Sequence, residues 1–177
     1  MRRTKHALLL LAGAALVVVS VAAATRSHPQ TSDVSASFTT SQSRMHTRTC
    51  TEGANTFRVT NATWRGMATS TESRLNGDLV IRTHTVLNET TGDGWLTGSW
   101  HTRNASTNQR SNARLNAVID NSTHVDGLAN GEVHRPGLRL LGNLSATIVG
   151  TTLAGELGAN VPVAPDNSAL LYRGGCP

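Results

Sequence analysis

The chain has 177 residues, a formal net charge of +5 and an aromatic content of only 3%. Much of that charge lies at the N-terminus, because the part from Thr25 onwards carries 13 arginines and no lysine against 11 acidic residues, a net charge of +2. These arginines are spread singly along the sequence, which argues against nucleic-acid binding, since that function needs a basic stripe or a reading element.

The first 24 residues have the pattern of an export signal. Arg2, Arg3 and Lys5 precede an apolar run over residues 7–19, and small residues follow at 22–24. Basic, apolar and small residues in this order are typical of a secretory signal peptide. We therefore predict that residues 1–24 are a signal peptide and that the protein is secreted. The alternative is an uncleaved segment that anchors it in a membrane, although the apolar run is shorter than the roughly 20 residues that span a bilayer.

Residues 25–43 are rich in serine and threonine, contain one aromatic residue and show no apolar period. Such a composition buries too little apolar surface to offset the entropy lost on ordering. We predict a disordered tether over residues 25–43. The remaining residues, 44–177, are numerous enough to form one domain with its own core.

The domain reads as a series of short strands with apolar residues at alternate positions. The expected strands cover residues 45–51, 55–65, 75–87, 94–103, 115–119, 125–133, 138–148, 153–157 and 168–175. Two of them, 75–87 and 94–103, form a hairpin, and pairing positions that sum to 181 matches their apolar faces. Neighbouring odd sums match the faces as well, so the exact register stays open. This register places Ile81 opposite Trp100, and Asp78 opposite Arg103 on the polar face.

Glycine recurs on the apolar face of these strands, at residues 77, 98, 127, 131, 142 and 155. Interior glycine marks bends or close backbone approach, and small residues fit the crowded interior of a strongly curved sheet. The pattern predicts an all-β fold, an antiparallel meander of about eight or nine strands closed into a small β-barrel. A two-sheet β-sandwich is the alternative.

The only two cysteines, Cys50 and Cys176, flank this domain. In an exported chain such a pair predicts a structural disulfide, with only one possible connectivity. Closing so long a loop stabilises the fold by about 4 to 5 kcal/mol in the chain-entropy model.

Residues with catalytic or metal-binding chemistry form no recognisable motif. The histidines lack metal-ligand spacing, and the chain has no nucleophile elbow, phosphate-binding loop or Cys-x-x-Cys. We therefore assign no catalytic residue, no metal site and no cofactor. If the barrel holds a small apolar ligand, we expect Leu79, Ile81, Trp100 and Leu144 to line its lumen.

The stretches GDLVIRTHTVLNETTGDGW, RLNAVI and RLLGNLSA with the terminal RGGC resemble uncharacterised secreted proteins of high-GC Gram-positive bacteria. The meander of glycine-bearing strands is also similar, at the level of the fold, to the small β-barrels of dirigent and allene oxide cyclase proteins. The first resemblance implies secretion, and the second implies a barrel. Neither supplies site residues, because a shared fold does not establish a shared function.

Three functions are consistent with these observations. The first is a noncatalytic secreted module for extracellular binding or surface interaction, with a cell-surface component as a possible partner. The second is a carrier of a small apolar ligand in the barrel. The third is a dirigent-like isomerase or hydrolase. A membrane is a partner only if the signal segment is retained.

Overall fold

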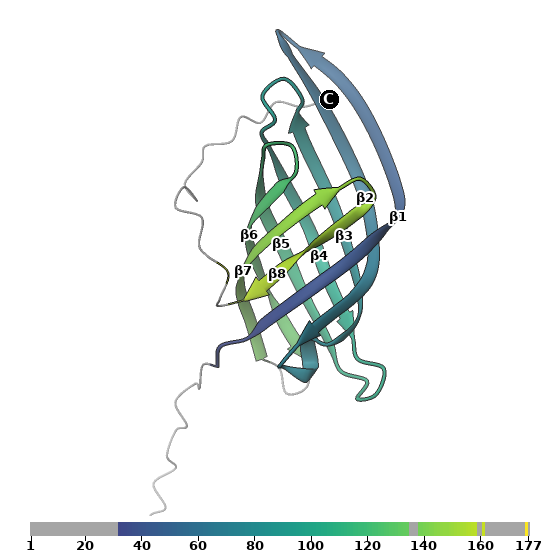
Figure 1. Ribbon diagram of the computed structural model, residues 1–177, viewed down its shortest axis with the longest axis vertical. Helices are drawn as coiled ribbons and strands as arrows, with labels where there is room; N and C mark the ends of the chain where they lie inside the picture. Colours follow the sequence, from purple (N-terminus) through teal and green to yellow (C-terminus); the bar gives the residue numbers. More distant parts are fainter. Residues whose placement is uncertain (1–31, 135–137, 159–160, 162–175, 177) are drawn as a thin grey trace, which may run out of the picture. The chain divides into compact units, whose positions relative to one another are not determined.

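The computed structural model describes residues 32–134, 138–158, 161 and 176. These form eight strands and one short 3-10 helix: β1 (Ser35–Glu52), β2 (Asn55–Ser70), η1 (Ser73–Leu75), β3 (Gly77–Asn88), β4 (Gly94–Arg103), β5 (Arg110–Asp120), β6 (His124–His134), β7 (Leu138–Val149) and β8 (Thr152–Gly158). Neighbouring strands pair antiparallel in chain order, and β8 pairs with β1, so the sheet closes into a barrel (Figure 1). The predicted all-β barrel is confirmed. The expected signal peptide and the strand expected at 168–175 lie outside the described residues.

The barrel is closed by a segment that we expected to be disordered. Ser35–Ser41 of β1 pairs with Thr152–Gly158 of β8, so the predicted tether is wrong for residues 35–43. Ala36, Phe38 and Thr40 are buried at alternate positions, whereas the serines and threonines between them face outwards. These three residues, one aromatic and two small, form the inner face of the segment, and all three are almost completely buried.

The predicted hairpin of β3 and β4 is confirmed with its register. Ile81 lies opposite Trp100, and Asp78 lies opposite Arg103. The guanidinium of Arg103 forms a long hydrogen bond of 3.5 Å to Asn108 and is not within ion-pair distance of Asp78 among the described residues. The pairing therefore follows from the two faces of the hairpin rather than from an ion pair.

Large apolar side chains fill the middle of the barrel. Ile81, Trp100 and Leu157 are 0% exposed, and the Phe38 ring packs edge-to-face on Trp100 with ring centroids 5.2 Å apart. The Trp100 Nε1 atom is buried without a hydrogen-bond partner among the described residues. The middle of the barrel is thus a packed core rather than a channel, as expected for an eight-stranded barrel.

The segment between β2 and β3 packs against the core at the end of the barrel opposite the β1–β2 turn. Leu75 of η1 is 1% exposed and belongs to the main core cluster. Beside it, the hydroxyl groups of Thr102 and Ser111 hydrogen-bond to each other, and Thr102 also donates to the carbonyl of Arg74 at 3.4 Å. We infer that η1 closes this end.

A second, smaller apolar cluster lies on the outer wall. Phe57, Val59 and Val86 are buried there, with Trp95 packed beside them and the disulfide between Cys50 and Cys176 covering them. The predicted disulfide is confirmed, and it attaches the end of the chain to the outside of β1 and β2.

Within the described ranges, no helix is long and apolar enough to cross a membrane.

Candidate functional site

The barrel opens where β1 separates from β8. After Ser41 the pairing with β8 ends, and a bulge at Ser43 shifts the register with β2 between Gln42 and Arg44. From residue 44 to residue 52, β1 pairs with β2 alone among the described residues, and this hairpin extends past the other strands (Figure 1). A bulge adds one residue to a strand and bends it. The hairpin therefore rises over the open end of the barrel, which we call the mouth.

The bulge also decides which side chains face the mouth. Before it, even-numbered residues such as Thr40 and Gln42 point inwards; after it, odd-numbered ones such as Met45 and Thr47 do so, since they pair with inward residues of β2. Met45 is 57% exposed at the rim. Without the extra residue, Arg44 and His46 would have faced the mouth instead.

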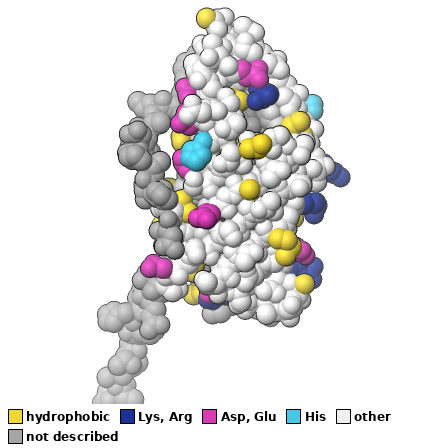
Figure 2. Space-filling model, in the orientation of Figure 1, with side chains coloured by type: hydrophobic (Ala, Val, Ile, Leu, Met, Phe, Trp, Pro, Cys, Tyr) yellow, Lys and Arg dark blue, Asp and Glu magenta, His cyan; other side chains and the backbone are white. Residues whose placement is uncertain are grey.

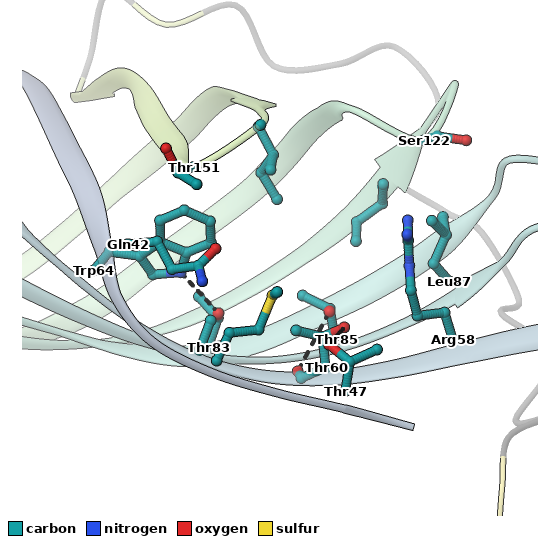
Figure 3. Close-up of a pocket in the computed structure, with 15 residues that line it drawn as sticks. Gln42, Thr47, Arg58, Thr60, Trp64, Thr83, Thr85, Leu87, Ser122 and Thr151 are labelled. Atoms are coloured by element: carbon teal, nitrogen blue, oxygen red, sulfur yellow. Dashed lines mark hydrogen bonds between the residues drawn. The ribbon is translucent and has the colours of Figure 1, made fainter. Parts of the chain in front are cut away.

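The mouth contains a cavity of about 420 Å³. Its apolar wall combines side chains from five strands: Met45, Ala62, Trp64, Leu87, Ile119 and Ile148. Its polar lining consists of one amide, one guanidinium and hydroxyl groups: Gln42, Arg58, Thr47, Thr60, Thr83, Thr85, Ser122 and Thr151. Figure 3 shows these side chains converging on one space from β1, β2, β3 and the turns above them.

The floor of the cavity is the top of the packed core. Trp64 lines the cavity and is also part of the core cluster, and its Nε1 donates a hydrogen bond of 3.0 Å to the hydroxyl of Thr83. This bond fixes the indole ring, because both groups are buried. The cavity is therefore blind, with solvent access at the rim only.

Hydroxyl groups form a chain along one wall. The Oγ1 atoms of Thr47 and Thr60 are 3.2 Å apart, and the Thr85 hydroxyl donates to the carbonyl of Thr60 at 3.4 Å (Figure 3). The side-chain amide of Gln42 has no hydrogen-bond partner within the described part of the chain, and it lies next to the Trp64 ring. The mouth thus presents an amide with free donors and a free acceptor.

Arg58 is the one charged residue among the described residues that line the cavity. Its Nη1 is 3.3 Å from the Glu89 carboxylate, and both side chains are about half exposed. A solvent-exposed pair of this kind is worth little, on the order of 1 kcal/mol or less, and a ligand can compete for either member. The lining therefore offers hydrogen bonds, apolar contact and one accessible cation, and the described part of the chain adds no carboxylate, imidazole or thiol to it.

The four residues that we expected to line a lumen lie deeper. Leu79, Ile81, Trp100 and Leu144 are at most 3% exposed and pack in the core cluster, and none of them borders the cavity. The interior space for a ligand is instead at the mouth. Among the described residues, no group of three His, Cys, Asp or Glu side chains is placed to hold a metal ion.

Most of the residues that line the mouth were missed by sequence reasoning. One signal was present, because the inward positions of β3 change from Leu79 and Ile81 to Thr83 and Thr85 along the strand. Such a change from aliphatic to hydroxyl side chains marks the point where the packed core ends and the solvent-accessible cavity begins. The bulge at Ser43 had no comparable signal, so the contribution of β1 was not foreseeable.

A second hollow, of about 450 Å³, borders the first residues of β1, Thr69–Thr71 and Glu156. It is lined largely by serine and threonine and has no aromatic side chain. The mouth combines an ordered indole ring, buried aliphatic groups and a free amide, which is the composition expected of a ligand site. We therefore treat the mouth as the candidate site.

A scan against protein-family models and searches of curated proteins and of solved structures found no match to this chain.

Proposed function

We propose that the protein is a secreted, noncatalytic binding module that holds a small, mostly apolar molecule in the mouth of its barrel. The observation that carries this proposal is the blind cavity above the packed core. Its volume of about 420 Å³ falls within the range of small-molecule sites, roughly 300 to 1,000 Å³. Secretion is supported by the export-signal pattern at residues 1–24 and by the disulfide.

The lining indicates the ligand's chemistry. An apolar body would pack against Trp64, Leu87 and Ile119, which are already desolvated on their core side. A polar group on the ligand would face the amide of Gln42 or the hydroxyl of Thr151. Apolar surface supplies affinity, and a few placed polar groups orient the molecule.

The lining favours binding over the dirigent-like enzyme that we considered. General acid–base catalysis requires a group that exchanges a proton near neutral pH, such as histidine or a carboxylate with a shifted pKa. The residues that border the cavity supply hydroxyl groups, an amide and a guanidinium. These groups bind and orient a ligand, and they support the noncatalytic function.

Filling the mouth tests this proposal. Thr47 lines the cavity from β1, so Thr47→Phe would place a ring in the space that the ligand needs. We expect this variant to bind an uncharged apolar fluorescent probe such as Nile red about tenfold more weakly, a loss of roughly 1.4 kcal/mol in binding free energy. Fluorescence titration of the secreted protein measures it.

Thr49→Phe is the matched control. Thr49 lies on the same strand in the same phase, and it does not border the cavity. Its probe affinity should stay at the wild-type value. Equal weakening by the two substitutions, or a wild-type protein that binds no probe, would rule out the mouth as the site.

A further inference from the structure

Four arginines lie together on the outer wall of the barrel, although they are far apart in sequence. The strand register places three of them in one row across β1–β5, in the order Arg44, Thr63, Arg82, Ser99, Arg114. Adjacent strands are about 4.8 Å apart, so successive arginines of the row are separated by about 10 Å. Arg65 is the diagonal neighbour of both Arg44 and Arg82. We call Arg44, Arg65, Arg82 and Arg114 the arginine face.

The arginine face carries uncompensated positive charge. All four side chains are exposed, and none forms an ion pair with another described residue. The row and the two rows beside it contain no Asp or Glu on β1–β5 and add three histidines: His46, His84 and His101. Most Lys and Arg side chains visible in Figure 2 lie along the right-hand edge of the molecule.

The other side of the barrel has the opposite charge. The outer positions of β6–β8 carry Asp126, Glu132 and Glu156, and their one arginine, Arg139, is paired with Glu132 at 3.2 Å. The net charge of the chain is therefore small although one side of the barrel is positively charged and the other side is negatively charged. Arginines that are single in the sequence become neighbours because each occupies the outward phase of its own strand.

We propose that the arginine face binds an anionic polysaccharide. Arginine forms paired hydrogen bonds to carboxylate, sulfate or phosphate groups, and a regular spacing suits charges that repeat along a polymer. Thr63, Ser99 and Asn116 lie between or beside the arginines and can hydrogen-bond sugar hydroxyl groups. His84 and His101 donate their Nδ1 hydrogens to Asn61 and Asn112 at 2.9 and 2.7 Å, which holds these polar side chains in place.

Two other polyanions fit this wall less well. A single-stranded nucleic acid needs exposed aromatic rings on which its bases stack, and none of the described residues in these three rows is aromatic. Trp95, in the next row, is half-buried against Val86 and the ring of His84. Stable attachment to an anionic membrane takes an apolar element that enters the bilayer in addition to basic residues. The arginine face instead has hydroxyl and amide groups between its cations.

The test compares binding to dextran sulfate and polygalacturonate at increasing salt concentration, using the secreted protein. Arg82→Gln and Arg114→Gln should each weaken binding about fivefold, the effect expected of one basic side chain near an anionic surface. Each should also reduce the slope of log Kd against log salt by about one. Arg139→Gln removes the same charge from the opposite wall and should leave both values unchanged.

The outcomes separate this proposal from that for the mouth. Failure of the wild-type protein to bind either polysaccharide at low salt, or an equal loss with Arg139→Gln, would overturn the arginine face. Tighter binding to duplex DNA or to vesicles of anionic phospholipid would overturn the choice of polysaccharide. Uptake of the apolar probe should be unchanged in the Arg82 and Arg114 variants, which also shows that they are folded.

Discussion

Glycine recurs on the inner wall where the backbone of a neighbouring strand occupies the place of a side chain. A Cβ atom added at Gly131 would lie 1.9 Å from the carbonyl oxygen of Asn112 and 2.4 Å from the Cα of Ala113. At Gly98 the nearest atom would be the carbonyl oxygen of Arg82, at 2.5 Å. Backbone atoms cannot move aside as a side chain can, so these glycines allow the sheet to coil tightly.

Gly131→Ala should therefore destabilise the barrel by about 1 to 3 kcal/mol, as overpacking does elsewhere. Gly142→Ala is the control, because its Cβ would meet the flexible Cδ2 of Leu157 at 3.3 Å and the Cα of Gly158 at 3.4 Å. We expect little change there. Urea unfolding of both variants measures the difference, and equal free energies of unfolding would contradict this explanation of the glycines.

For single residues, the sequence predicted which face of a strand each side chain occupies. It did not predict where a bulge interrupts the alternation of inward and outward positions. Ile81 and Trp100 were placed opposite each other because a shift of one residue would expose an apolar set to water. The extra residue at Ser43 leaves no such trace, because its two chain neighbours, Gln42 and Arg44, are both polar. Serine and threonine, which supply most of the polar lining of the mouth, occur on both the inner and the outer face of a sheet.

At the scale of the elements, η1 depends on one carboxylate. Glu72 accepts hydrogen bonds from the backbone N–H of Arg74 at 3.1 Å and from its Nε and Nη2 at 2.7 and 2.6 Å. The Arg74 side chain is the main reason why the pKa of Glu72 falls from 4.5 to about 2. This ion pair holds the turn that carries Leu75 into the core.

Glu72→Gln should lower the free energy of unfolding at neutral pH by about 1 kcal/mol, a modest value because the pair is partly solvated. The folded pKa lies below the unfolded one, so the stabilisation is complete above pH 4.5 and is lost as the pH falls towards about 2. The difference between wild type and variant should therefore shrink between these values. Thermal unfolding across this range tests the effect; a difference that persists at the acidic end would exclude the charge as its cause. Glu156→Gln, an exposed carboxylate on β8, serves as the control.

The whole molecule is held together by two separate closures. Backbone pairing of residues 35–41 with β8 closes the sheet, whereas the disulfide attaches Cys176 to the outer wall near the far end of β1. The sequence predicted the barrel, because alternation and glycine act along every strand. It did not predict the first closure, since the inner face of residues 35–41 consists of Ala36, Phe38 and Thr40 within a serine- and threonine-rich stretch.

Because the strand pairing and the disulfide are separate closures, we expect different results when each of them is removed. A chain that starts at Ser32 should fold, whereas one that starts at Arg44 should lose cooperative unfolding, because β8 would keep only its pairing with β7 and the Phe38 contact with Trp100 would be gone. Replacing both cysteines by serine should instead lower stability by about 4 kcal/mol in the chain-entropy model, while the β-sheet circular dichroism and a single transition remain. Thermal unfolding followed by circular dichroism compares the three proteins.

Cooperative unfolding of the chain that starts at Arg44 would show that closure does not need residues 35–41. Loss of the fold in the cysteine variant alone would show that the covalent link, rather than the pairing of β1 with β8, keeps the barrel closed.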